Sequence, residues 1–382
     1  MPESPERDAR ELRLTTALLG VLKIIGGYTD PEFIEATAHA KNLAEKSGNF
    51  GQLVLHIVAM WASANTAGDI RASTAFADQA LDLASRSRNP ASIALAHMAQ
   101  IGACLLRADL LRAEDYFISG IDLFAEPEFQ RVPGSVAYTF GTASLNALAL
   151  GRADTARERI RQSILGSSKK KNPYEETWAK SLAAELHLHL RELGEAAALA
   201  RQVIKCSDEN GFSQFASVGR LILGCALANL GQAAEGVRLI REGLDDSHGP
   251  GSVFGIGGAL AALASAQALG NSITEALATV EEALQTHAHR PETVRLRGEL
   301  RLKLDQAALA EADFRDAIAL ARTMNAKTWE LRATVSLARL LTRQGKRDEA
   351  RTMLDGIYGS FTEGFDTADL KDATALLDEL GS

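Results

Sequence analysis

The chain has 382 residues, of which 46% are apolar and 5% aromatic, and its net charge is −8. This length exceeds that of a usual single-core domain, so it implies two or three globular domains or one elongated repeat structure. Only 9 prolines interrupt the chain, which favours a continuous helical structure. The low aromatic content argues against a sheet-rich fold, and the apolar content argues against disorder. An acidic chain without a basic face is not expected to bind nucleic acid.

Three cysteines, Cys104, Cys206 and Cys225, lie far apart in the sequence. None has the spacing of a zinc site or of a C-x-x-C redox pair, so no metal is expected there. Free cysteines in apolar helical surroundings are typical of a reducing compartment, which predicts a cytoplasmic protein. The first residues are charged and lack the apolar stretch of a signal peptide, and no apolar run is long enough to cross a bilayer. We therefore expect no membrane contact.

From the N-terminus onward the sequence repeats one unit, a helix, a tight turn and a second helix, at spacings of about 35 to 43 residues. Nine such pairs are expected, with first helices beginning near Glu6, Phe50, Pro90, Gly134, Pro173, Phe212, Ser252, Pro291 and Lys327. Glycine ends a helix readily because it adopts a left-handed conformation at little cost. The turns within the pairs are predicted at Gly27, Gly68, Asp109, Gly151, Gly194, Gly231, Gly270, Asp305 and Gly345, of which seven are glycines.

A last amphipathic helix is predicted to begin at Asp366. Its apolar stripe is Leu370, Ala373, Leu376, Leu377 and Leu380. Such a helix covers the exposed end of a solenoid. The sequence therefore predicts an all-α fold, a right-handed α-solenoid of about nine antiparallel helix pairs over residues 1–365 with a capping helix over residues 366–382.

Small residues at regular positions indicate which kind of repeat this is. Tetratricopeptide-like pairs place a small residue seven positions before the turn and another about five after it, so that the two helices approach closely. The eighth pair follows this pattern with Gly298 and Ala310. Three pairs depart from it, because Trp61, His187 and Leu263 fall where a small residue is expected. In those pairs either the helices splay apart or the true turn is displaced.

The C-terminal stretch carries a more specific pattern. Residues 329–340 read WELRATVSLARL, residues 344–351 read QGKRDEAR, and residues 357–370 read IYGSFTEGFDTADL. This stretch resembles the C-terminal tetratricopeptide region of large bacterial signalling proteins. Those proteins carry a class III adenylate or guanylate cyclase domain or a DNA-binding domain, then a signal-transducing ATPase, then such a solenoid. The resemblance extends over nearly the whole chain and implies the sensor or scaffold arm of a signalling system, with a cyclase or ATPase as a possible partner.

No constellation of chemically active residues stands out. His187 and His189 lie on different sides of one helix, and His287 and His289 have no third ligand nearby, so no metal site is predicted. The glycine-rich run 251–258 follows no strand, and the sequence has no Gly-x-x-x-x-Gly-Lys-Ser/Thr loop for phosphate. We therefore predict no catalytic residues, no cofactor and no enzymatic activity.

In this architecture the first helix of each pair lines the concave surface. We expect a protein or peptide segment to bind there, with apolar groups in the middle and acidic groups toward the C-terminal repeats. The alternative is a receptor for a small-molecule or peptide inducer, which a closed apolar pocket between Tyr138 and Gln267 would favour. The predicted groove residues are Asn65, Tyr138, Leu188, Arg191, Cys225, Asn229, Gln267, Arg295, Arg339 and Arg343.

Overall fold

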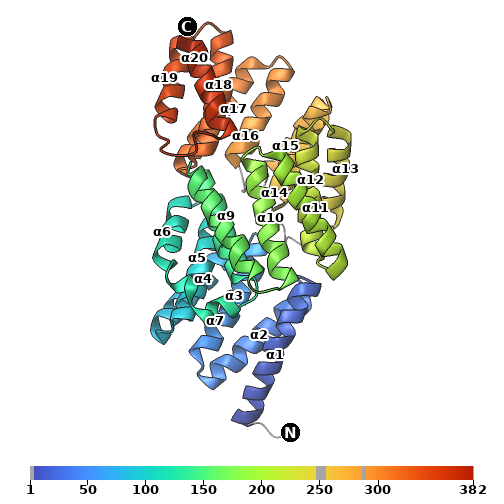
Figure 1. The fold of residues 1–382 in the computed structure, drawn as a ribbon, viewed down its shortest axis with the longest axis vertical. Helices are drawn as coiled ribbons and strands as arrows, with labels where there is room; N and C mark the ends of the chain where they lie inside the picture. The colour runs from blue at the N-terminus through green and yellow to red at the C-terminus, as the bar shows by residue number, and fades with distance from the viewer. Residues whose placement is uncertain (1–3, 247–254, 286–289, 382) are drawn as a thin grey trace.

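The computed structural model describes residues 4–246, 255–285 and 290–381. Within these residues the regular elements are helices, and they form nine consecutive pairs that follow one another along the chain (Figure 1). The pairs are α1 (Pro5–Ile25) with α2 (Pro31–Ser47), α3 (Phe50–Thr66) with α4 (Ile70–Ser87), α5 (Pro90–Leu106) with α6 (Leu110–Gly120), α8 (Ser135–Ala149) with α9 (Ala153–Ser168), α10 (Pro173–His189) with α11 (Leu193–Asn210), α12 (Ser213–Asn229) with α13 (Ala233–Asp246), α14 (Gly255–Leu269) with α15 (Ile273–Ala283), α16 (Arg290–Lys303) with α17 (Ala307–Thr323), and α18 (Lys327–Arg343) with α19 (Arg347–Tyr358).

Three further elements complete the described chain. A 3-10 turn, η1 (Leu123–Ala125), and the short helix α7 (Pro127–Arg131) lie between the third and fourth pairs. Helix α20 (Ala368–Gly381) follows the ninth pair. The expected start of the seventh pair, Ser252, lies outside the described residues.

The helices begin where the sequence provides acceptors for their free backbone N–H groups. The side chains of Asn49, Asp69 and Asn89 each accept a hydrogen bond from the backbone amide three residues later. Such caps satisfy N–H groups that have no partner within the helix. Proline also opens α2, α5 and α10, where its fixed φ suits a helix and its missing N–H costs nothing.

One residue in the turn of each pair adopts a left-handed conformation. In five pairs it is a predicted glycine, namely Gly27, Gly68, Gly151, Gly231 and Gly345. In the fifth pair it is Arg191, with a φ of 64°, so the turn predicted at Gly194 is three residues late. The small position seven residues before this turn is then occupied by Ala184 instead of His187. The fifth pair therefore follows the repeat pattern, and His187 departed from it only because the turn was predicted three residues too late.

The same correction applies to the seventh pair. Its left-handed residue is Asn271, one residue after the predicted Gly270. Counting back seven residues from Asn271 places Ala264 at the small position, where Leu263 had been expected. Ala264 is fully buried against α15 and its neighbours, as a close helix contact requires.

Trp61 does occupy the small position of the second pair. Its indole lies against Gly102 of α5, where a Cβ atom would be only 2.4 Å from the ring. Trp61 also packs edge-on against Tyr138 of α8, with ring centroids 5.6 Å apart. A glycine in the next repeat thus provides the space that the large side chain needs.

The solenoid curls back on itself, so that its C-terminal repeats contact its middle. The Thr328 hydroxyl of α18 donates a hydrogen bond to the Leu148 carbonyl of α8, 180 residues earlier. Figure 1 shows the red helices α18–α20 directly above the green helix α9. A small apolar cluster joins the same two regions through Leu110, Leu150, Ala321 and Ala326.

Helix α20 covers the last pair. It begins at Ala368, two residues after the predicted Asp366, and the Thr367 hydroxyl accepts the N–H of Leu370 at 3.5 Å. Asp366 instead pairs with Arg157 of α9 at 2.9 Å. The predicted apolar stripe packs onto α18 and α19, with Leu370, Ala373, Leu376 and Leu380 buried.

Candidate functional site

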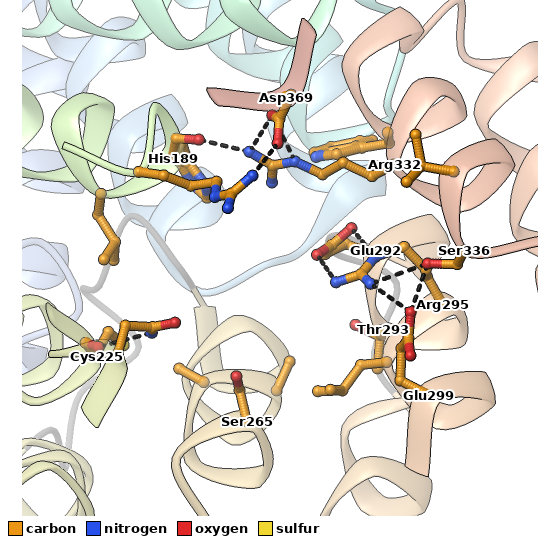
Figure 2. A pocket seen from close by; sticks show the side chains of 18 of the residues that line it. His189, Cys225, Ser265, Glu292, Thr293, Arg295, Glu299, Arg332, Ser336 and Asp369 are labelled. Carbon is orange, nitrogen blue, oxygen red and sulfur yellow. Dashed lines mark hydrogen bonds and ion pairs between the residues drawn. The ribbon is translucent and has the colours of Figure 1, made fainter. Parts of the chain in front are cut away.

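A partly enclosed cavity of about 390 Å³ lies inside the C-terminal half of the superhelix. Its walls come from α10, α12, α14, α16 and α18, the first helices of five consecutive pairs, and from α20. Figure 2 shows side chains from these helices around a common open space. We call this space the inner pocket.

Two helices, α12 and α14, form a wall of small and uncharged side chains. The Asn229 amide donates a hydrogen bond to the Cys225 carbonyl at 2.9 Å, which leaves its own side-chain oxygen as an acceptor. Burial raises the pKa of the Cys225 thiol to about 12, so this sulfur stays protonated and unreactive. Short side chains allow a ligand's backbone to approach this wall closely. The wall consists of Cys225, Ala228, Asn229, Gly258, Ala261, Ala262, Ser265 and Ala266.

The opposite wall, from α16 and α18, carries paired charges. Arg295 donates two hydrogen bonds to the Glu292 carboxylate, at 2.6 and 2.9 Å. Burial by itself would raise the pKa of Glu292, but the adjacent Arg295 guanidinium outweighs this and lowers the pKa to about 2. Glu299 accepts a hydrogen bond from the Ser336 hydroxyl at 2.5 Å. Glu292 therefore stays ionised, and both carboxylates of this wall are hydrogen-bonded.

A third group of charges joins α10, α18 and α20 above the pocket in Figure 2. Arg332 donates to the Asp369 carboxylate at 2.8 Å and to the backbone carbonyl of His189 at 2.5 Å. Arg191 donates to Asp372 at 2.7 Å and to Asp369 at 3.4 Å. The Arg332 and Asp369 side chains are only 14% and 15% exposed, whereas those of Arg191 and Asp372 are 47% and 41% exposed. The first pair is thus sheltered and the second faces solvent.

Arg339 differs from the other arginines of the pocket. Arg191, Arg295 and Arg332 each pair with a carboxylate of the chain. Arg339 lines the pocket and is exposed, and it forms no ion pair with the residues that the structure describes. A guanidinium presents several N–H donors in a planar fork that suits a carboxylate. The pocket lining holds four arginines and four carboxylates, and Arg339 is the arginine among them that pairs with no carboxylate of the described residues.

The structure brings six of the ten predicted groove residues into the inner pocket. They are Leu188, Arg191, Cys225, Asn229, Arg295 and Arg339. The other four lie elsewhere. Asn65 and Tyr138 belong to the packed N-terminal half, where Asn65 accepts a hydrogen bond from Ser73. Gln267 is only 3% exposed, and Arg343 is exposed one turn beyond the pocket lining.

Sequence reasoning missed the part that α20 plays in the pocket. Asp369 and Asp372 reach Arg191 across 178 and 181 residues of sequence, and no local pattern reveals such a contact. It also missed most of the wall from α14. The available signal was the run of small residues from Gly258 to Ala266, because it occupies a first helix that faces the concave surface.

The histidines expected not to bind metal are placed as follows. His187 and His189 face different carboxylates, Glu192 at 2.5 Å and Glu185 at 3.8 Å. His287 and His289 lie outside the described residues. Within the part of the chain that the structure describes, no group of three or more metal-ligating side chains could hold an ion. Among the helices described, none is long and apolar enough to span a bilayer.

Comparison with solved structures supports the fold. A Rap protein complexed with competence and sporulation factor is similar with a TM-score of 0.57 and 10% identity, over 87% of this chain and 97% of that one. The apo quorum sensor NprR from B. thuringiensis has a TM-score of 0.55 and 12% identity, over 92% of this chain and 98% of that one. NprR in complex with its cognate peptide NprX has a TM-score of 0.54 and 12% identity, over 86% of this chain and 99% of that one.

No protein-family model matches the chain, and no curated protein matches its sequence. At identities this low, the solved structures establish the fold alone. The cyclase- and ATPase-linked part of the resemblance rests on the sequence pattern. The predicted fold class is confirmed, and the chain has the fold of a tetratricopeptide-like right-handed α-solenoid with a C-terminal covering helix.

Proposed function

We propose that this chain is a non-catalytic regulatory module that holds a short peptide segment in its inner pocket. The observation that carries the proposal is the pocket itself, whose walls come from five consecutive repeats and from α20. Its volume of about 390 Å³ falls in the range of ligand sites, roughly 300 to 1,000 Å³. Two solved proteins of similar fold support this choice, since Rap is complexed with competence and sporulation factor and NprR with its cognate peptide.

The chemistry of the walls favours a peptide over an apolar small molecule. An apolar ligand would need a closed apolar pocket between Tyr138 and Gln267, but aromatic rings fill the beginning of that region. Tyr138 packs against Trp61 and Trp178, with ring centroids 5.6 and 5.8 Å away. The inner pocket begins at Leu188 within that region and extends beyond it, and it combines small side chains with polar ones, such as Asn229 and Ser265. Small side chains beside donors and acceptors suit the amide groups of a peptide backbone.

The bound segment should carry a carboxylate that faces Arg339. This guanidinium is the pocket arginine without an ion pair among the described residues, so an acidic side chain or a C-terminal carboxylate would compensate its charge. The same reasoning places the uncharged part of the segment against α12 and α14. Arg343, which the sequence had grouped with Arg339, lies outside the pocket lining.

A cyclase- or ATPase-linked signalling protein is the partner class that the C-terminal sequence pattern favours. The segment bound in the pocket could belong to such a protein or be a free peptide, and both share the same chemistry. We place the chain in the cytoplasm, which is consistent with its three unpaired cysteines.

A peptide array tests the proposal directly. Short synthetic peptides, each with a free or an amidated C-terminus, are probed with the wild-type chain, and the bound peptides are then titrated in solution. Arg339→Glu should weaken the binding of carboxylate-bearing peptides at least tenfold at low salt, and less at high salt. Arg343→Glu is the matched control, because it reverses an exposed charge on the same helix outside the pocket. An array that yields no peptide, or equal losses in both variants, contradicts the proposal.

A further inference from the structure

The segment between α19 and α20, together with the beginning of α20, docks onto two distant turns of the solenoid. Residues 360–372, which we call the clasp segment, carry an acidic residue at every third position from Glu363 onward. Each of these acids binds a group of α9 or of the α10–α11 turn, between 178 and 209 residues earlier. The four acids are Glu363, Asp366, Asp369 and Asp372.

Glu363 caps a helix that has no cap of its own. The residue before α9 is Arg152, and its side chain makes no capping hydrogen bond. One Glu363 oxygen accepts the Thr155 backbone N–H at 2.9 Å, and the other accepts the Thr155 hydroxyl at 3.1 Å. In return, the Gly364 backbone N–H donates to the Asp154 carboxylate at 3.1 Å. Free N–H groups and the positive end of the helix dipole stabilise a carboxylate at this place.

The shapes of the two surfaces also match. Gly364 has a φ of 75°, and a Cβ atom there would lie 2.7 Å from the Cβ of Ala153. Gly151 in the α8–α9 turn has a φ of 83°, and a Cβ atom there would lie 2.8 Å from the Phe361 ring. Glycine on each side therefore permits a close approach that other residues would prevent. The clasp segment is complementary to the start of α9 in hydrogen bonding, charge and shape.

Apart from the sheltered Arg332–Asp369 pair, the charged contacts of the clasp segment are open to solvent. Arg157 donates to Asp366 at 2.9 Å and to Glu192 of the α10–α11 turn at 2.7 Å. The Arg157 and Asp366 side chains are 28% and 66% exposed. Exposed ion pairs are individually weak and are screened by salt. These outer contacts are therefore readily broken, while the buried Thr328–Leu148 hydrogen bond and the apolar cluster around Leu150 join the same two regions.

The clasp segment is also part of the pocket wall. Asp369 and Asp372 line the inner pocket together with their partners Arg191 and Arg332. We propose that the clasp segment holds the superhelix closed around the inner pocket and that its release opens the pocket. Ligand binding and clasp docking are then linked, so each changes the equilibrium of the other by the same factor. This linkage rests on the proposed function, whereas the closure itself is a property of the free chain.

The test uses the free chain, with no ligand. The variant Glu363→Ala/Asp366→Ala removes the three hydrogen bonds that these acids accept from Thr155 and Arg157, and neither residue lines the pocket. We expect a larger radius of gyration by small-angle X-ray scattering. We also expect roughly tenfold faster hydrogen exchange at the Thr155 amide, the magnitude typical of a lost helix cap. The wild-type chain should expand in the same way when sodium chloride is raised.

Glu235→Ala/Glu242→Ala is the matched control. It also removes two exposed acids, both paired with Arg238 within α13, and it should leave the radius and the exchange at Thr155 unchanged. A clasp variant with the wild-type radius and exchange overturns the inference. If that variant unfolds, the salt series of the wild-type chain decides, and a radius that does not grow with salt overturns it. This test needs no peptide, so a peptide array that fails does not affect it. If the clasp test fails, the peptide array still decides whether the inner pocket binds a peptide.

Discussion

The indole of Trp61 lies so close to Gly102 that a Cβ atom at Gly102 would be 2.4 Å from its ring and 2.3 Å from the Tyr138 hydroxyl. This contact joins the first helices of the second, third and fourth pairs. It explains how a tryptophan occupies a position that the repeat reserves for a small residue. The first helices of these three pairs can pack this closely because residue 102 has no side chain.

Gly102→Ala should therefore destabilise the chain, although alanine normally favours a helix. Neither ring can move away without disturbing the packed cluster around Tyr138, so we expect a loss of about 1–3 kcal/mol in the free energy of unfolding. Gly20→Ala is the control, because no atom lies within 4 Å of a Cβ built at this helical glycine. That variant should be neutral or more stable by roughly 0.5–1 kcal/mol. Urea denaturation followed by circular dichroism measures both, and equal stability of the two variants would contradict the packing argument.

Glu114 and Arg159 form a buried ion pair between the third and fourth repeats. Both side chains are almost fully buried, and two hydrogen bonds of 2.7 Å join them. Glu114→Ala leaves the Arg159 charge buried without its main partner, so we expect a loss of about 3–5 kcal/mol. The double variant Glu114→Leu/Arg159→Met should recover much of that loss. A single variant as stable as the wild-type chain in urea would show that the pair contributes little.

The Glu292–Arg295 pair in the pocket wall predicts a pH effect. The folded-state pKa of Glu292 is lowered from 4.5 to about 2, so the pair stabilises the fold above pH 4.5. That contribution declines as the pH falls from 4.5 toward 2. Glu292→Gln removes it, so the stability gap between wild type and variant should shrink by roughly 1 kcal/mol between about pH 6 and about pH 3.5. Arg332 and His189 also face this carboxylate and remain in both proteins. A stability difference between the wild-type chain and Glu292→Gln that does not change with pH would refute the lowered pKa of Glu292.

The repeat architecture could be predicted from the sequence because its signals are local. Asn49, Asp69 and Asn89 begin helices through their own side chains, and Gly151 ends one at the expected position. The turn of the fifth pair was misplaced because an arginine adopts the left-handed conformation there, and a glycine three residues later offered the stronger signal.

The inner pocket could be predicted only in part. The rule that first helices face inward predicted residues such as Asn229 and Arg339 in the groove, and both line the inner pocket. It gave no reason to expect Asp369 there, because this residue arrives through a fold-back of the whole chain. The hydrogen bond between Glu363 and Thr155 spans 208 residues, and its partners have no sequence feature that identifies them as a pair.

The central claim is that a peptide segment occupies the inner pocket. It is tested most directly by filling that pocket with Ala261→Trp, which projects a large side chain from the small wall of α14. Ala308→Trp, at an exposed position of α17 outside the pocket, is the matched control. The affinity of each variant is measured by titration with a peptide that the wild-type chain selects. Circular dichroism verifies that each variant is folded. We predict that Ala261→Trp abolishes binding while Ala308→Trp binds as the wild type does. A folded Ala261→Trp variant with wild-type affinity would contradict the account.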